Sequence, residues 1–152
     1  MEDDKLKEKG TVKGRILSID YGAKRTGIAV TDPLKIIATG LTTVETQSLM
    51  PFLKSYFAKE VVELVIIGLP VNWDDTDTDV TALVKHFING FRKNFPHLPI
   101  QEVDERFTSK MASKAMLDMG MKKKQRQNRA MIDEIAATIM LQEYLNTSGF
   151  KD

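Results

Sequence analysis

The 152-residue chain contains no cysteine, which excludes disulfide bonds, thiolate metal ligands and a cysteine nucleophile. Its two histidines, His86 and His97, are too few and too isolated for a zinc site. No apolar run approaches the roughly 20 residues that a transmembrane helix needs. The charged stretch Met1–Gly10 also lacks the apolar core of a signal peptide. We therefore expect a cytoplasmic protein that has no membrane span.

An excess of one charge is also missing, because 22 basic and 21 acidic residues leave a net charge of +1. The chain is not globally basic, but basic residues can still gather locally. They are densest between positions 122 and 129, where the five bases are Lys122, Lys123, Lys124, Arg126 and Arg129. This basic run is either a phosphate-binding surface or a solvated loop before a helix. The run alone does not decide between the two.

Apolar patterning predicts an α/β fold with five strands and four helices. The strands are expected at Arg15–Asp20, Thr26–Asp32, Ile36–Val44, Leu64–Gly68 and Ile100–Asp104, and the helices at Gln47–Lys59, Val80–Phe95, Ser109–Met119 and Ala130–Leu145. The first strands are close enough along the chain to form a hairpin at Gly22, and strands and helices then alternate. This order predicts a five-stranded mixed sheet flanked by helices. We expect residues 1–13 to be a flexible tail and residues 14–152 to be a single domain.

Three carboxylates lie where a sheet of this kind gathers its ligands, at the ends of its strands and on a facing helix. Asp20 closes the first strand, and Glu105 closes the last. Asp133 shares a face of the last helix with Ala137, a small residue that lets the helix approach the sheet. Magnesium prefers oxygen ligands, and such sites activate water and hold a phosphodiester. The three acids therefore suit a divalent metal site.

Each acid also has a purely structural explanation. Asp20 could cap a turn, Glu105 could pair with the arginine that follows it, and Asp133 could cap its helix. Their joint placement is what favours a metal site. Asp104 competes with Glu105 for the strand-end position, because neighbouring strand residues point to opposite faces and only one of them should face the site. Spacing alone does not choose between these two acids.

Other signals in the sequence are weaker. Asp74–Asp79 superficially resembles a calcium-binding loop, but Val80 stands where the loop needs a glycine and His86 where it needs a glutamate. No Gly-x-x-x-x-Gly-Lys-Ser/Thr phosphate loop occurs. Tyr21 and Trp73 could stack on nucleic-acid bases, although each is an isolated aromatic residue.

Four segments, taken together and in order, resemble a single family. They are Ile19-Asp20-Tyr21-Gly22-x-Lys24-Arg25-x-Gly27-Ile28-Ala29, Gly68-Leu69-Pro70-x-Asn72, Asp104-Glu105-Arg106-x-Thr108, and Asp133-x-x-Ala136-Ala137 followed by Leu141-Gln142-x-Tyr144-Leu145. The chain resembles the YqgF/RuvX family of pre-16S ribosomal RNA nucleases, once called Holliday junction resolvase-like proteins. The resemblance extends roughly from Gly14 to Leu145, nearly the whole domain.

The resemblance implies an RNase H-like fold and hydrolysis of phosphodiester bonds, with Mg²⁺ or Mn²⁺, to mature the 5′ end of small-subunit ribosomal RNA. It implies that the catalytic, metal-binding acids are Asp20, Glu105 and Asp133, which favours Glu105 over Asp104. It also implies that Lys24, Arg25 and Arg106 face the substrate phosphates. We further expect substrate contacts from Asn72, Thr108 and the basic run Lys122, Lys123, Lys124, Arg126 and Arg129. The chain departs from the family in Trp73–Asp79, where relatives have a glycine-containing loop and this chain has four acids and no glycine.

Three other functions stay open at this point. A Holliday junction resolvase would use similar chemistry on four-way DNA as a symmetric dimer. A non-catalytic, ribosome-associated binding module would tolerate loss of the acids. An actin-like or sugar-kinase-like ATPase shares Asp20-x-Gly22, but it needs a second half that 152 residues cannot hold. The expected partners are nucleic acid, as a ribosomal RNA precursor or structured DNA, and the ribosome; the chain is expected to be a monomer or a homodimer.

Overall fold

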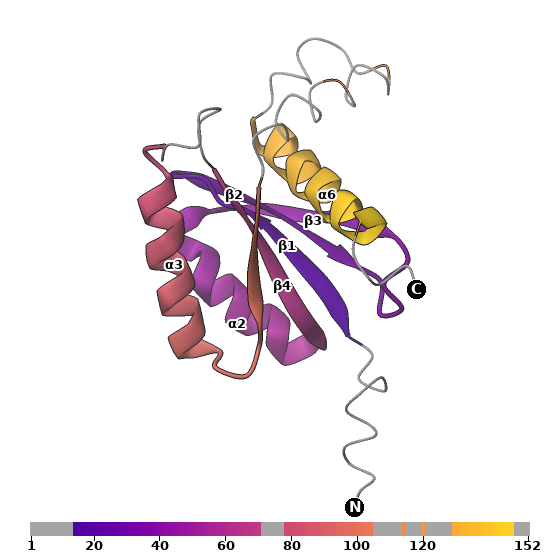
Figure 1. Cartoon of the computed structure of the whole chain (residues 1–152), viewed down its shortest axis with the longest axis horizontal. Coiled ribbons are helices and arrows are strands. Elements are labelled where there is room, and N and C mark those ends of the chain that lie inside the picture. The colour runs from indigo at the N-terminus through magenta and orange to yellow at the C-terminus, as the bar shows by residue number, and fades with distance from the viewer. Residues whose placement is uncertain (1–13, 71–77, 105–113, 115–119, 121–128, 148–152) are drawn as a thin grey trace, which may run out of the picture.

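The computed structural model describes residues 14–70, 78–104 and 129–147, together with Lys114 and Gly120 (Figure 1). The elements are β1 (Arg15–Asp20), β2 (Arg25–Thr31), β3 (Ala38–Glu45), the 3₁₀ turn η1 (Thr46–Ser48), α2 (Leu49–Lys59), β4 (Val62–Leu69), α3 (Thr81–Asn94), β5 (Ile100–Asp104) and α6 (Arg129–Thr147).

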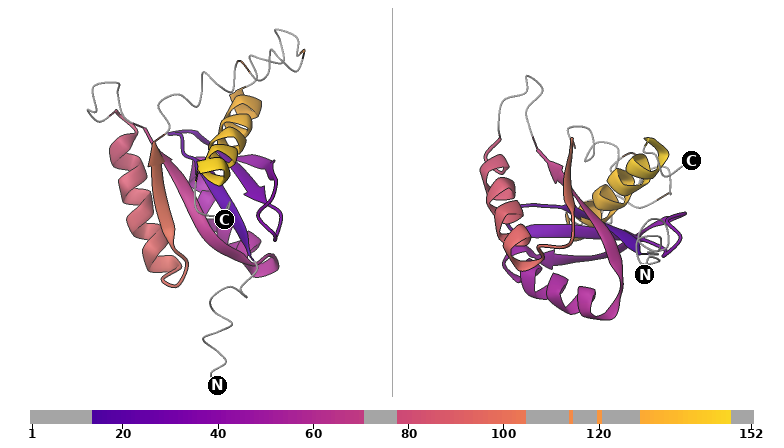
Figure 2. Two further views of the ribbon diagram at one scale, coloured as in Figure 1. Left: turned by 45° about the vertical axis from the view of Figure 1, so that its right-hand side comes forward. Right: turned by 60° about the horizontal axis from the view of Figure 1, so that its bottom comes forward.

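The strands form one sheet in the order β3-β2-β1-β4-β5. β2 is antiparallel to both β1 and β3, whereas β4 is parallel to β1 and β5 is parallel to β4. Helices α2 and α3 cover one face of the sheet, and α6 crosses the other (Figures 1 and 2). The predicted five-stranded mixed sheet with flanking helices is confirmed.

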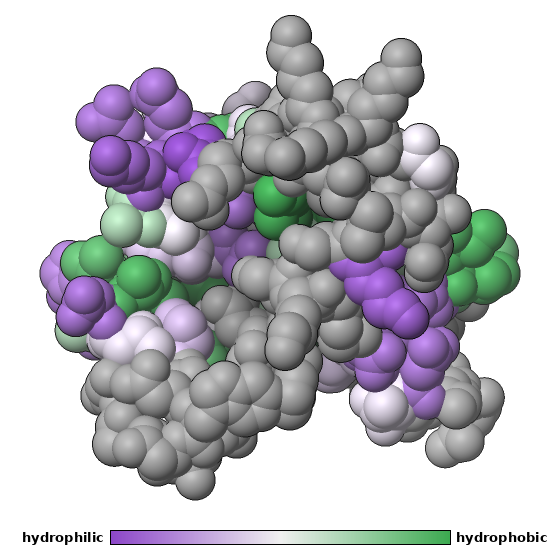
Figure 3. All heavy atoms as spheres, turned by 90° about the horizontal axis from the view of Figure 1, so that it is seen from above, coloured by the Kyte–Doolittle hydropathy of each residue, from purple (hydrophilic) through white to green (hydrophobic). Residues whose placement is uncertain are grey.

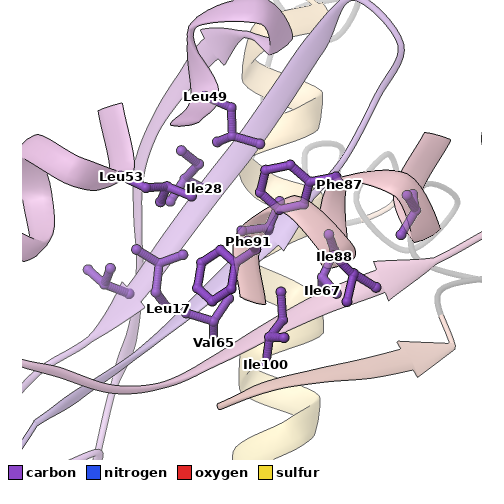
Figure 4. Packing of buried hydrophobic residues seen from close by; sticks show 13 residues of the cluster. Leu17, Ile28, Leu49, Leu53, Val65, Ile67, Phe87, Ile88, Phe91 and Ile100 are labelled. Atoms are coloured by element: carbon purple, nitrogen blue, oxygen red, sulfur yellow. The ribbon is translucent and has the colours of Figure 1, made fainter. Parts of the chain in front are cut away.

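The core beneath α2 and α3 is built from large apolar side chains. Leu17 of β1 and Phe91 of α3 are fully buried there and lie close to Val65 and Ile67 of β4 (Figure 4). Ile66, between the last two, is fully buried on the opposite face, against α6. β4 is therefore covered on both faces, as its continuous apolar run predicted.

The core beneath α6 combines large aliphatic side chains with two alanines. Ile16 and Ala29 contribute to it from the sheet, and Ala137 contributes from the helix. Ser18 lies on the same face, because its hydroxyl bonds to the α6 backbone. Since strand side chains alternate between faces, Asp20 follows Ile16 and Ser18 onto the α6 face.

The expected bounds of β2, β3 and β4 were wrong by one or two residues, and Asp32 explains two of these differences. Its Oδ1 accepts hydrogen bonds from the backbone amides of Ile36 and Ile37, each at 2.8 Å, which hold both residues in the loop between β2 and β3. β3 therefore begins at Ala38 rather than at Ile36, and β2 ends at Thr31 rather than at Asp32. The same amide donors, that of Ile37 foremost, lower the pKa of the Asp32 carboxyl.

Most expected helix boundaries hold to within two residues. On α3, Leu83 is 43% exposed, whereas its neighbour Val84 is fully buried. The expected helix at Ser109–Met119 and the expected tail at residues 1–13 lie outside the described residues.

None of the helices that the structure describes is long and apolar enough to cross a membrane.

Candidate functional site

The turn between β1 and β2 is held by threonine hydroxyls. The carbonyl oxygen of Gly22 accepts a hydrogen bond from Thr46 Oγ1 at 2.6 Å, and its amide donates a long bond of 3.5 Å to Thr26 Oγ1. The two hydroxyls bond to each other at 2.8 Å. A Cβ on Gly22 would lie 2.3 Å from the carbonyl oxygen of Arg25, so the turn needs glycine here. Both backbone groups of Gly22 thus have hydroxyl partners.

Helix α6 is fixed to the sheet by two side-chain hydroxyls. Thr43 Oγ1 of β3 donates to the carbonyl oxygen of Ala130 at 2.6 Å. Ser18 Oγ of β1 donates to the carbonyl oxygen of Ala137 at 3.0 Å, in a fully buried position. Because the two bonds lie two turns apart along α6, they set both the height and the direction of the helix over the sheet.

Between these two anchors, the backbone of α6 lies directly on Gly27 of β2. A Cβ at Gly27 would be 2.0 Å from the carbonyl oxygen of Asp133 and 2.3 Å from its carbonyl carbon. Gly27 pairs with Asp20 across the β1–β2 ladder. Asp20 and Asp133 therefore come together at one end of one sheet face, although 113 positions separate them in the sequence.

Asp133 forms an ion pair with Arg25. Arg25 Nε donates to Asp133 Oδ2 at 3.2 Å, with the two side chains 38% and 24% exposed. Beside the pair lies an open hollow of about 440 Å³ whose walls also include Gly22, Ala23 and Lys24. Seen from this end, the described surface carries hydrophilic patches on two sides (Figure 3). The interpretation of Asp133 as a helix cap is wrong, since Asp133 lies within α6 and pairs with a strand residue.

The structure distinguishes the two faces at the end of β5. Val103 packs with the α6 core, and the Gln101 side chain accepts a hydrogen bond from the Tyr144 hydroxyl of α6 at 3.1 Å. Asp104 follows Val103, so it points to the other face and away from Asp20. Glu105 lies outside the described residues.

Several other predicted site residues also lie outside the described part of the chain: Asn72, Arg106, Thr108, Lys122, Lys123, Lys124 and Arg126. Arg129 is the first residue of α6, but its side chain is not described. Of the predicted site residues, the structure therefore brings together Asp20, Asp133, Lys24 and Arg25.

One expected aromatic contact is corrected. The Tyr21 ring packs against Phe87 of α3, with 5.4 Å between ring centroids, and burial raises the pKa of its hydroxyl. Tyr21 is thus part of the α3 side of the core and not a platform for bases. Trp73 lies outside the described residues.

The sequence did not reveal the residues that support the site. Ser18 and Thr43 occur in strands where hydroxyl residues are common, and nothing in the pattern showed that they bond to a distant helix. Gly27 was a better clue, because a glycine inside a strand often marks a close backbone approach.

The chemistry of the carboxylates fits a divalent cation. Asp20 and Asp133 offer the oxygen donors that Mg²⁺ and Mn²⁺ prefer. Two carboxylates that share a site repel each other unless a cation lies between them, so a metal ion would relieve this repulsion. Among the residues that the structure describes, no three acidic or histidine side chains form a cluster. A third ligand would have to come from the remainder of the chain.

Comparisons with known proteins place this chain in a family. The family model described as RuvX, Holliday junction resolvase, matches residues 14–147. A protein of Flavobacterium johnsoniae with the name "Putative pre-16S rRNA nuclease" is 57% identical over 136 residues, covering 90% of this chain and 99% of its own. A protein of Bacteroides thetaiotaomicron with the same name is 52% identical over 136 residues, with the same coverage of both chains.

The fold has a solved counterpart. Fowlpox virus resolvase, in a crystal structure with Holliday junction DNA, superimposes with a TM-score of 0.56 at 15% identity, over 88% of this chain and 97% of the resolvase. The RNase H-like fold implied by the sequence resemblance is thereby confirmed. Because the family model and the relatives both span nearly the whole domain, the chain belongs to the RuvX family.

Proposed function

We propose that this chain is a metal-dependent nuclease that hydrolyses phosphodiester bonds in the precursor of 16S ribosomal RNA. The substrate follows the name shared by relatives that are 52% and 57% identical to it. The observation that carries the proposal is the convergence of Asp20 and Asp133 across Gly27, beside the bases Lys24 and Arg25. Acids that bind a metal and bases that bind phosphates are the two parts that such a reaction needs.

We assign Glu105 as the third acid. Val103 faces α6 and Asp104 faces away, so a strand extended by one residue would turn the next side chain back to the α6 face. The family resemblance implies the same residue. Asp104 is then outside the site.

Asp20, Glu105 and Asp133 would hold Mg²⁺ or Mn²⁺. When bound, such an ion makes water a better nucleophile and stabilises the negative charge that develops on the phosphate. Asp20 and Asp133 would fix the position of the reaction at the end of β1, where the contact between Gly27 and the Asp133 backbone brings them together. Lys24 and Arg25 would bind the neighbouring phosphates. Further substrate contacts are assigned to Asn72, Arg106, Thr108 and the basic run.

The experiment compares Asp20→Asn and Asp133→Asn with the unchanged chain in Mn²⁺-dependent cleavage of a pre-16S RNA fragment. We expect each substitution to reduce the cleavage rate by about 100-fold or more, because each removes a carboxylate ligand of the cation that would stabilise the charge on the phosphate. The Tm of Asp20→Asn should change little, whereas that of Asp133→Asn should fall slightly, because it loses the partly exposed ion pair with Arg25. Asp104→Asn is the matched control and should leave cleavage unchanged. Undiminished cleavage by Asp20→Asn would rule out the assigned site.

A four-way DNA junction should be tested in parallel, because the family description names Holliday junctions. Cleavage of the RNA with little or no cleavage of the junction supports ribosomal RNA processing. Cleavage of the junction alone would replace the RNA substrate with DNA. Binding of either nucleic acid, without cleavage by the unchanged chain, would instead indicate a non-catalytic binding module.

A further inference from the structure

The ion pair between Arg25 and Asp133 is built into the packing of the domain. Arg25 is the first residue of β2, two positions before Gly27, and so lies on the same face of that strand. Asp133 lies over Gly27 through its own backbone. Both ends of the pair are therefore fixed by main-chain contacts, and the 3.2 Å distance between Arg25 Nε and Asp133 Oδ2 follows from this arrangement.

This pair conflicts with metal binding at Asp133. Oδ2 is already engaged by the guanidinium, so a cation reaching that oxygen would have to displace it. A cation that binds the other oxygen, Oδ1, would lie within a few ångströms of the positive Arg25 guanidinium. Because the Asp133 side chain is only 24% exposed, water would screen the repulsion between the two positive charges only in part. In either case, a divalent ion and the paired guanidinium repel each other.

We propose that Arg25 is a positioning residue: its guanidinium holds the Asp133 carboxylate in place of a metal cation. It must move away when a divalent ion binds. The guanidinium has room to turn, because its side chain is 38% exposed and borders the hollow of about 440 Å³. Lys24 lines the same hollow, so the displaced Arg25 would lie beside a second base facing solvent. Metal binding would thus release Arg25 toward the phosphates. This inference rests on the proposed function, because it takes Asp133 to be a metal ligand.

The test measures Mn²⁺ affinity by titration of the full chain without nucleic acid. Arg25→Gln should bind Mn²⁺ about fivefold more tightly or better, a typical size for the coupling between two binding events. Lys24→Gln is the matched control, because it removes the same charge from the same hollow without removing the ion pair; its affinity should change by less than about twofold. Arg25→Lys keeps the charge but loses the guanidinium and should lie between Arg25→Gln and the unchanged chain.

Two results would overturn the inference. Arg25→Gln that binds Mn²⁺ no more tightly than Lys24→Gln would show that only overall charge matters. Arg25→Gln that binds more weakly would show that Arg25 supports the metal ligand instead of competing with the ion. If Arg25→Gln folds poorly, Arg25→Lys takes its place, and it should bind Mn²⁺ more tightly than the unchanged chain does.

Asp133→Asn separates this inference from the proposed function. If Asp133→Asn binds Mn²⁺ as the unchanged chain does, Asp133 is not a ligand, and the metal site itself is wrong. If Asp133→Asn loses Mn²⁺ binding while Arg25→Gln shows no gain, the metal site stands and only the role of Arg25 fails.

Discussion

Replacing Gly27 with alanine tests whether the contact between β2 and α6 sets the site. The added Cβ would lie 2.0 Å from the Asp133 carbonyl oxygen and 2.8 Å from the amide nitrogen of Glu134. Both are main-chain atoms of α6, so no side chain can rotate to make room. The shorter distance is about 1.4 Å below the 3.4 Å at which ordinary contact begins, and α6 must move by a similar amount.

Moving α6 should lower the free energy of unfolding, the Tm and the cleavage rate. Overpacking a well-packed interior costs about 1–3 kcal/mol, and a main-chain clash belongs at the upper end, about 3 kcal/mol. In a domain of this size, that loss lowers the Tm by about 6–12 °C. A catalytic group misplaced by about 1 Å can cost about 100-fold in rate, so Gly27→Ala should lose cleavage as well as stability.

Gly90→Ala is the matched control, because the same chemical change meets open space. A Cβ at Gly90, inside α3, would have only Met50 Cε nearby, at 4.0 Å. Alanine is the better helix former by about 0.5–1 kcal/mol, so this variant should gain about 1–4 °C. Thermal unfolding by circular dichroism and Mn²⁺-dependent cleavage are measured on both. A Gly27→Ala variant with the Tm and cleavage rate of the unchanged chain would refute the close contact.

Three further predictions concern the interior. Ser18→Ala removes the buried bond to the Ala137 carbonyl and should cost about 1 kcal/mol in chemical unfolding, whereas Ser55→Ala on the exposed side of α2 should change little. Phe91→Ala deletes a fully buried ring and should cost about 3–5 kcal/mol in the same assay. Burial raises the pKa of every tyrosine, so the folded chain holds these phenol protons more tightly than the unfolded one. Stability should therefore be complete below about pH 10 and fall above it, as unfolding at several alkaline pH values would show; unchanged stability would contradict the burial of Tyr21, Tyr56 and Tyr144.

The sheet could be predicted from the sequence because its signals are local. The apolar run of β4 and the short link at Gly22 each specify an element without reference to distant residues. The errors arose where a side chain overrides a local pattern. Ile36 and Ile37 have strong strand preferences, yet the Asp32 carboxylate binds their amides and keeps them out of β3.

The site could be predicted only in part, because its geometry is made by contacts that are distant in sequence. Helical spacing placed Asp133 on the packed face of α6, and that prediction is confirmed by the contact of its backbone with Gly27. The pairing of Arg25 with Asp133 spans 108 positions, and no periodicity reports such a contact. Lys24 and Arg25 looked equivalent in the sequence, but only the fold shows that Arg25 is on the face that α6 covers.

The two faces of the sheet are packed in different ways, and the difference bears on the site. Under α2 and α3, large side chains such as Phe91 bury much apolar surface, which contributes about 25 cal/mol for each Å². Under α6, small residues such as Gly27 and Ala29 bury less, but they let a helix backbone rest on the sheet. A main-chain contact cannot change rotamer, so it holds Asp133 relative to Asp20 more firmly than interlocking long side chains would. Larger residues on this face could add apolar contact only by lifting α6, and the same displacement would separate the two carboxylates.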